Sequence, residues 1–328
     1  MKTIRVLTIA FLAGLGLWSA RRLLQPHGER PSSLPPVPPR MDHTHQSIQA
    51  EERDANPQVI KSTEQVGSPM PPSDSLLGSI SDRTRAVVDA NGSHSFNERI
   101  KEARVLGTKL TNNDVTTLFW YLTRKEQDSL VKNAVINALR DQEVPPAGLA
   151  EALIAIYQDS DQDPILRNYA LQHLGLWYPK AELSEKQRVH NVLMEASQEP
   201  SDLAGTALLA AQRLSQDHEE FEPGQITESA LRVARDDGRG ELARITGLQV
   251  CSRLGATEIL PVAIRLAQNG GSVSLRLSAI AVIGDLGDAI MLRPLDALSA
   301  DANPRIQTAA RSALSRLRGR LRMTRNQE

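Results

Sequence analysis

Two short groups of consecutive aromatic residues carry the side chains best suited to recognising another molecule. They occupy positions 118–121 (LFWY) and 176–179 (LWYP). Consecutive residues of a helix point about 100° apart, so the rings of one group cannot all face the same core. Exposed Trp and Tyr side chains are the usual energetic anchors of protein interfaces. We therefore predict four partner-binding residues: Trp120, Tyr121, Trp177 and Tyr178. In the alternative, these rings fill gaps in irregular packing.

The chain carries no signature of catalysis or of metal binding. It contains no GxSxG, no HExxH and no glycine loop of the kind that binds phosphate or a dinucleotide. Its seven histidines are scattered, and His43 and His45 form an isolated pair that is more often inert than a metal site. Cys251, the one cysteine, falls at a core position of a predicted helix and is expected to be a buried structural thiol. We expect no catalytic residue, no metal site, no cofactor and no enzymatic activity.

Most of the chain follows one repeated pattern, in which an aliphatic residue precedes small and aliphatic residues at steps of three and four. This spacing predicts a helix at each copy. The aliphatic position recurs at intervals of 35, 37, 40, 32 and 31 residues. It is occupied by Val131, Leu166, Leu203, Ala243, Leu275 and Ile306, and a degenerate copy lies at 96–107. A second, shorter helix is expected before each copy, at 113–122, 146–157, 184–196, 225–235, 258–268 and 289–298.

The repeated pattern resembles the HEAT-repeat family, most closely its bacterial form. The resemblance is strongest over residues 283–317 and weaker over 97–282. It implies an all-α fold, a right-handed α-α superhelix of the HEAT or armadillo type with about six to seven helix pairs over residues 78–320. The second helix of each pair would line the concave face. Such a motif is specific for the fold and says little about function.

A basic residue often follows the aliphatic position of the repeat. The four examples are Lys132, Arg167, Arg244 and Arg276. We expect these side chains to form a structural ladder with loop carboxylates, here Asp128, Asp163 or Asp237. The alternative is a groove for an anionic ligand, but Ala204 and Gln307 interrupt the series.

Nucleic-acid binding is not expected, although some HEAT-like proteins are DNA glycosylases. Trp120, Trp177 and Asp161 could imitate the aromatic and acidic residues of such enzymes. The formal net charge of the chain is only −1, and the expected concave positions are neutral where a glycosylase is basic. These positions are Asn133, Asn137, Asn168, Gln172 and Gln212.

The two ends of the chain differ in character from the repeats. Residues 6–20 are apolar and lie between basic residues, so segment 1–22 is predicted to be a single-pass membrane anchor or, alternatively, a cleaved export signal. Segment 23–77 is proline-rich and is predicted to be a disordered linker. Segment 321–328 is predicted to be a basic flexible tail. The arginines near it are expected to form the polar cap of the solenoid, and contact with anionic lipid is the alternative.

These features together suggest a non-enzymatic scaffold or adaptor for protein–protein interaction. It would be tethered to an inner membrane through residues 6–20, with the N-terminus cytoplasmic and the solenoid periplasmic, within an envelope or secretion assembly. After signal cleavage it would instead be soluble in the periplasm or secreted. A membrane-anchored periplasmic chaperone for secreted clients is the second hypothesis. A HEAT-like nucleic-acid-binding protein or DNA glycosylase is the third.

Overall fold

The computed structural model describes residues 79–89, 92–124, 128–144 and 146–325. These ranges contain helices, turns and loops and no strand. The predicted anchor or signal at 1–22, the predicted linker at 23–77 and the pair His43 and His45 lie outside them. Among the described residues, no helix has both the length and the apolar character that a bilayer crossing requires.

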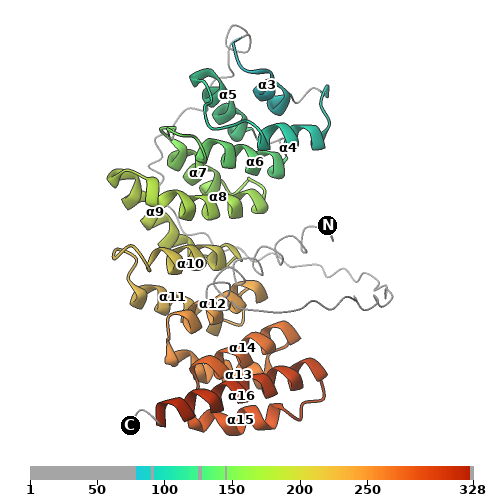
Figure 1. The fold of residues 1–328 in the computed structure, drawn as a ribbon, viewed down its shortest axis with the longest axis vertical. Coiled ribbons are helices and arrows are strands. Elements are labelled where there is room, and N and C mark those ends of the chain that lie inside the picture. Colours follow the sequence, from blue (N-terminus) through green and yellow to red (C-terminus); the bar gives the residue numbers. More distant parts are fainter. Residues whose placement is uncertain (1–78, 90–91, 125–127, 145, 326–328) are drawn as a thin grey trace, which may run out of the picture. The chain divides into compact units, whose positions relative to one another are not determined.

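Consecutive helices of the described chain pack in pairs (Figure 1). The first helices of the pairs are α3 (Asp82–Val88), α5 (Asn112–Thr123), α7 (Leu149–Gln158), α9 (Leu183–Ala196), α11 (Pro223–Arg235), α13 (Leu260–Asn269) and α15 (Leu292–Leu298). The second helices are α4 (Phe96–Arg104), α6 (Ser129–Arg140), α8 (Pro164–Trp177), α10 (Leu203–Leu214), α12 (Glu241–Arg253), α14 (Val273–Leu286) and α16 (Pro304–Arg325). The short 3-10 turns η1 (Tyr178–Lys180), η2 (Thr257–Ile259) and η3 (Ala289–Met291) precede α9, α13 and α15.

Each second helix packs against the second helix of the next pair, from α4 through to α16. The chain from residue 79 onward is therefore an all-α solenoid, as predicted. The aliphatic position of the repeat is buried in every copy, and so is the small residue three or four positions later. The aliphatic residues are Val131, Leu166, Leu203, Ala243, Leu275 and Ile306.

Local sequence signals define where several helices begin. At α4, Ser95 and Glu98 form a capping box, in which the Ser95 hydroxyl accepts from the Glu98 amide and the Glu98 carboxylate accepts from the Ser95 amide. Thr111 and Asp114 do the same at α5. The buried Asp114 carboxylate also accepts from the Ser81 amide at 2.9 Å, which ties α5 to the start of α3. The cap of one pair therefore helps to hold the preceding pair.

Small residues let successive second helices approach closely. A Cβ placed on Gly175 of α8 would lie 2.7 Å from the Cβ of Ala210 on α10. A Cβ on Gly284 of α14 would lie 2.8 Å from the Cβ of Ala313 on α16. Real Cβ atoms do not approach so closely, so these two interfaces require glycine.

The basic residues that follow the aliphatic position turn toward the first helix of their own pair. Lys132 Nζ donates to the carbonyl of Arg124 at the end of α5. Arg167 Nε donates to the Tyr157 carbonyl near the end of α7 at 2.7 Å. These bonds satisfy carbonyls that a helix end leaves without an intrahelical donor. The predicted structural ladder is present, with helix carbonyls as important partners.

The carboxylate partners of this ladder are only partly those expected. Asp237 pairs with Arg244 at 2.5 Å, as predicted. Asp128 and Asp163 instead cap the helices that follow them, because their side chains accept from the amides of Leu130 and Ile165. Arg167 pairs with Glu199 at 3.4 Å.

Helix α16 continues through Arg325, so the prediction of a flexible tail from residue 321 is wrong for its first part. Arg, Leu and Met have high helix propensity, and no proline follows Pro304 to end the helix. Gly319 does not interrupt α16 either.

A matched pair of glycine variants tests the close packing of α14 and α16. We expect Gly284→Ala to lower the free energy of unfolding by ~1–3 kcal/mol, because the added methyl collides with Ala313. Gly319→Ala meets no atom within 4 Å and is expected to raise it by ~0.5–1 kcal/mol through helix propensity. Denaturant unfolding followed by circular dichroism measures both. Equal effects of the two substitutions would contradict the close approach.

Candidate interaction surface

The aromatic group on α5 divides between the core and the surface. Tyr121 is fully buried, whereas Phe119 and Trp120 are half-buried. The Tyr121 hydroxyl lies 2.6 Å from Arg99 Nη2, and the Arg99 guanidinium lies 5.6 Å from the centre of the Tyr121 ring. Burial raises the pKa of Tyr121 to about 12. Tyr121 therefore joins α5 to α4 and is not a surface anchor, which corrects the prediction for this residue.

Trp120 is the one predicted anchor that remains partly accessible. It lies near the end of α5, and the Arg124 guanidinium sits 5.0 Å from the centre of its ring. The ends of the first helices and the beginnings of the second helices share one edge of the solenoid. Leu130, an exposed residue of α6, lies on this edge with Trp120.

The second aromatic group is buried, contrary to the expectation that one of its rings faces solvent. Trp177 and Tyr178 both lie in the core. The Tyr178 ring meets the Phe221 ring edge to face, with centroids 5.0 Å apart, and its hydroxyl donates to Glu220. Trp177 ends α8 and Tyr178 begins η1, and the Tyr178 ring is covered by His218 and Phe221 from the connection between α10 and α11. Trp177 and Tyr178 are packing residues, which corrects both predictions.

A neutral histidine bridges α6 and α8 in the interior. His173 Nδ1 lies 3.0 Å from Arg140 Nη1, and His173 Nε2 lies 2.8 Å from Asn133 Oδ1. Because a guanidinium can only donate, Nδ1 is the acceptor and Nε2 carries the proton. Burial and the charge of Arg140 lower the pKa of His173 to about 3. This histidine is a structural link and is not available as a general base near neutral pH.

Two of the other neutral residues expected on the concave side bond to neighbouring helices. Asn168 Oδ1 on α8 accepts from Thr206 Oγ1 on α10 at 2.5 Å. Gln212 Oε1 on α10 accepts from Arg253 Nη1 on α12 at 3.4 Å. Asn137 and Gln172 donate within their own helices, to the Asn133 carbonyl and to Asn168 Oδ1.

The residues that could imitate a DNA glycosylase are not assembled. Trp120 lies on α5, Trp177 is buried at the end of α8, and Asp161 is exposed in the connection between α7 and α8. Cys251 is buried, and burial raises the pKa of its thiol to about 12, so it stays protonated. Within the described residues, no group of three or more His, Cys, Asp or Glu side chains is placed to hold a metal ion.

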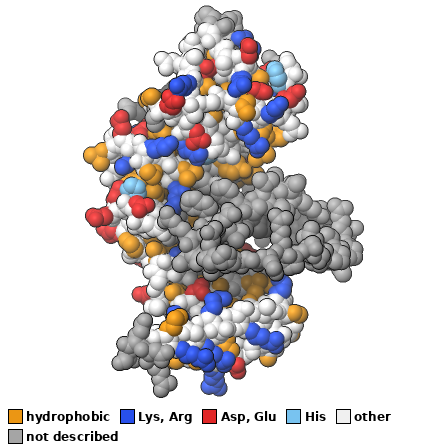
Figure 2. Space-filling model, viewed as in Figure 1, with side chains coloured by type: hydrophobic (Ala, Val, Ile, Leu, Met, Phe, Trp, Pro, Cys, Tyr) orange, Lys and Arg blue, Asp and Glu red, His pale blue; other side chains and the backbone are white. Residues whose placement is uncertain are grey.

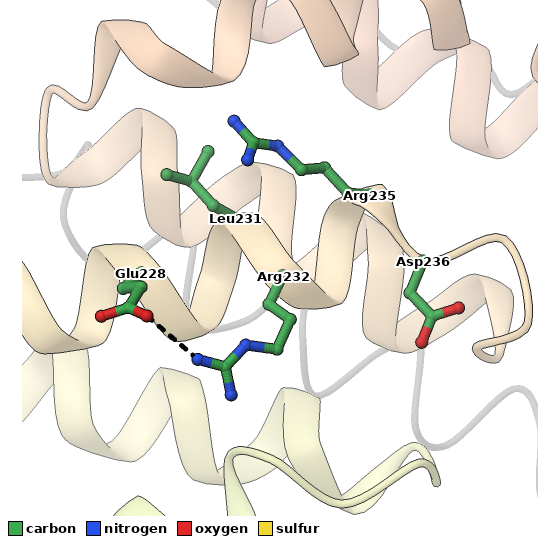
Figure 3. Close-up of a pocket in the computed structure, with 5 residues that line it drawn as sticks. All are labelled: Glu228, Leu231, Arg232, Arg235 and Asp236. Atoms are coloured by element: carbon green, nitrogen blue, oxygen red, sulfur yellow. Dashed lines mark hydrogen bonds and ion pairs between the residues drawn. The ribbon is translucent and has the colours of Figure 1, made fainter.

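A shallow depression of about 490 Å³ lies on α11 (Figure 3). Its lining is Glu228, Leu231, Arg232, Arg235 and Asp236. Glu228 and Arg232 form an ion pair at 3.1 Å, and Arg232 and Arg235 point to opposite sides of the helix. These exposed charges converge on no common point, so the depression offers no arrangement for catalysis.

The arginines of α16 serve two purposes. Arg316 pairs with Asp285 of α14 at 3.2 Å, and Arg320 donates to the Gly287 carbonyl, so both hold the last pair to its neighbour. Arg318 and Arg322 are exposed and form no ion pair with another described residue. Lys and Arg side chains gather at this end of the solenoid (Figure 2). Contact of this cap with anionic lipid stays a prediction.

On the earlier helix pairs, four exposed aliphatic side chains mark the edge where the second helices end, and we call this set the apolar edge. Its members are Val105, Val144, Leu176 and Leu183. Val105 follows α4, Val144 follows α6, Leu176 lies at the end of α8, and Leu183 begins α9. Val144 and Leu183 are the most exposed members of the set, at 81% and 85%.

Hydrogen bonds fix the first two connections of the apolar edge side by side. The Glu143 amide donates to the Thr108 carbonyl at 3.1 Å. Gln142 Nε2 donates to the Gly107 carbonyl at 2.8 Å, and Gln142 Oε1 accepts from the Leu110 amide at 2.8 Å. The sequence analysis missed this surface because Val105 and Val144 lie in connections, and Leu176 and Leu183 lie at helix ends, where helical periodicity gives little signal. The only available sign was a single aliphatic residue in a polar segment.

Two substitutions distinguish the buried aromatic residues from the exposed aliphatic ones. Tyr178→Ala is expected to cost ~3–5 kcal/mol of folding stability, because it removes a buried ring that packs on Phe221. Leu183→Ala is expected to change the stability by less than ~0.5 kcal/mol, because Leu183 is exposed. Thermal or denaturant unfolding of both variants provides the measurement. If Tyr178→Ala costs little folding stability, Tyr178 is not a packing residue, and the prediction that it is a surface anchor is supported again.

Comparison with known proteins gives weak similarity only. No protein-family model matches the chain, and no curated protein does. One solved structure with similarity is that of human deoxyhypusine hydroxylase in complex with glycerol. It has 13% sequence identity and a TM-score of 0.33, and the alignment covers 72% of this chain and 95% of that one. Another is a designed armadillo repeat protein, with 14% identity, a TM-score of 0.36 and coverage of 72% and 98%.

Proposed function

We propose that the solenoid is a non-enzymatic scaffold that binds a protein partner along the apolar edge. The observation that carries this proposal is the exposure of Val144 and Leu183, two aliphatic side chains at the ends of neighbouring helix pairs. Complete burial of such a side chain stabilises a complex by roughly 1.5–3 kcal/mol.

The rigidity of the apolar edge supports the same proposal. Gln142 and Glu143 bond to the preceding connection, so Val144 is held in place before any partner binds. A surface that is already ordered loses less conformational entropy on association. The partner would present an apolar stripe with both charges at its margin, because Lys109 and Glu143 form an exposed ion pair beside Val144.

The groups that could perform catalysis favour a scaffold over an enzyme. Cys251 is buried and protonated, and His173 donates one ring proton to Asn133 while accepting from Arg140. Neither residue lines the depression on α11. Trp120 remains a second candidate anchor, on the opposite edge of the solenoid from Val144.

Charge placed on the apolar edge should abolish partner capture. A photo-crosslinking residue at position 144 or 183 of the full chain is expected to give one discrete adduct in cells. Combining Val144→Asp with Leu183→Asp should weaken binding of the isolated partner at least tenfold, since two apolar contacts are replaced by desolvated charges. Ile290→Asp is the matched control, because Ile290 is 74% exposed in a later connection. Equal loss in the control, or none in the double variant, would refute the proposal.

We further propose that residues 6–20 hold this scaffold at the inner membrane, with the solenoid on the periplasmic side. The support is their apolar sequence between Arg5 and Arg21. The full chain is then expected in the membrane fraction after carbonate extraction, and a chain that begins at Ser75 in the soluble fraction. Recovery of a soluble protein whose N-terminus follows a cut near Ala20 would replace the anchor with a cleaved signal.

A further inference from the structure

A second pocket lies between two connections of the later pairs. Its volume is about 250 Å³, and it opens between the α11–α12 connection, the end of α13 and the α13–α14 connection. The lining consists of Asp237, Arg244, Arg265, Leu266, Asn269, Gly270 and Gly271. The guanidinium groups of Arg244 and Arg265 therefore line one small space. Their two positive charges favour a negatively charged occupant.

Arg244 departs from the behaviour of its equivalents in other pairs. In those pairs, Arg167 Nε donates to Tyr157 O at 2.7 Å, and Arg276 Nε donates to Ala267 O at 2.8 Å. Arg244 is only 9% exposed, and its Nε is buried without any hydrogen-bond partner among the described residues. A buried donor without an acceptor is costly, so it calls for an explanation.

The carbonyl that corresponds to the acceptor in the other pairs bonds instead to a residue of the following helix pair. The carbonyl of Arg235, at the end of α11, accepts from Arg265 Nη2 at 3.4 Å. Arg265 Nη1 also lies 3.1 Å from Asp237 Oδ2, and Arg244 Nη2 lies 2.5 Å from Asp237 Oδ1. The Asp237 carboxylate thus bridges both guanidiniums and still leaves Arg244 Nε unsatisfied.

We propose that this pocket is a binding site for a phosphate-type dianion. Two guanidiniums carry a charge of about +2, which a phosphate dianion neutralises and a single carboxylate does not. A tetrahedral anion also has more acceptor oxygens than the two of Asp237, so it can bond to the Nη atoms of Arg244 and of Arg265 together. Asp237 is largely exposed, and its side chain can turn into solvent when the anion enters.

The size of the pocket limits the ligand to the phosphate group itself. Its 250 Å³ lies below the usual range of about 300–1,000 Å³ for pockets that enclose small organic ligands. The bound group is then either free phosphate or the phosphoryl group of a larger molecule, the rest of which remains outside the pocket. The apolar edge lies on earlier helix pairs, so this site stands or falls independently of the proposed function.

Calorimetric titration of the full-length protein with inorganic phosphate tests the site. We expect saturable binding at one site per chain. Arg265→Gln should weaken it about tenfold, since it removes a charge-assisted hydrogen bond. Asp237→Asn should tighten it, because the competing carboxylate is lost. Arg232→Gln and Glu241→Gln are matched controls that change the same charges outside the pocket, and Arg232 is 48% exposed against 46% for Arg265. Both controls should change the affinity less than about twofold.

Two further ligands identify the chemistry and the source. Acetate should bind much more weakly than phosphate, because it lacks the second charge and the additional oxygens. O-phosphoserine that binds as tightly as phosphate would assign the site to phosphoryl groups on larger molecules, whereas binding of inorganic phosphate alone would assign it to the free ion. Absence of saturable phosphate binding, equal binding of acetate, or equal effects in the control variants would overturn the proposal.

Discussion

The close contact between successive second helices is the constraint on which the solenoid depends. At Gly175 and Gly284 the neighbouring alanines, Ala210 and Ala313, leave no room for a Cβ. Backbones at this separation allow side chains from one layer to reach main-chain carbonyls of the next, as Arg213 does at Gly175. Because each layer contacts only its neighbours, every such contact must be satisfied locally. Small residues at these positions are therefore a requirement of the packing.

The same constraint explains the uneven distribution of aromatic and polar core residues. His173 occupies the repeat position that Ala210 and Ala313 occupy in later pairs. The larger ring separates α6 from α8 and needs Asn133 and Arg140 as partners. Similarly, Tyr178 fills the space beside the α10–α11 connection that a regular pair would close with aliphatic side chains. Irregular helix pairs carry large or polar side chains at positions where regular pairs carry alanine. These side chains are buried in the packing and are therefore not available to bind a partner.

What remains for interaction is found in the connections between helices. The helices must satisfy the stacking on both sides, whereas a connection can expose an aliphatic residue such as Val144 without disturbing the neighbouring layers. The apolar edge and the pocket beside α14 have opposite character, one apolar and one cationic. They lie on different pairs, so one rigid solenoid can present both at once.

The sequence alone determined the repeat, because buried aliphatic and small residues at steps of three and four are a local property of each helix. It therefore predicted the helix pairs, the buried Cys251 and the inward-turned basic residues such as Arg167. It could not show that Trp177 and Tyr178 are both buried, because His218 and Phe221 of a later connection cover the Tyr178 ring. It also could not bring Arg265 to the Arg235 carbonyl, or Val144 beside the connection at Thr108. These contacts join residues about 30 to 40 positions apart, and only the stacking of one layer on the next sets the distance between them.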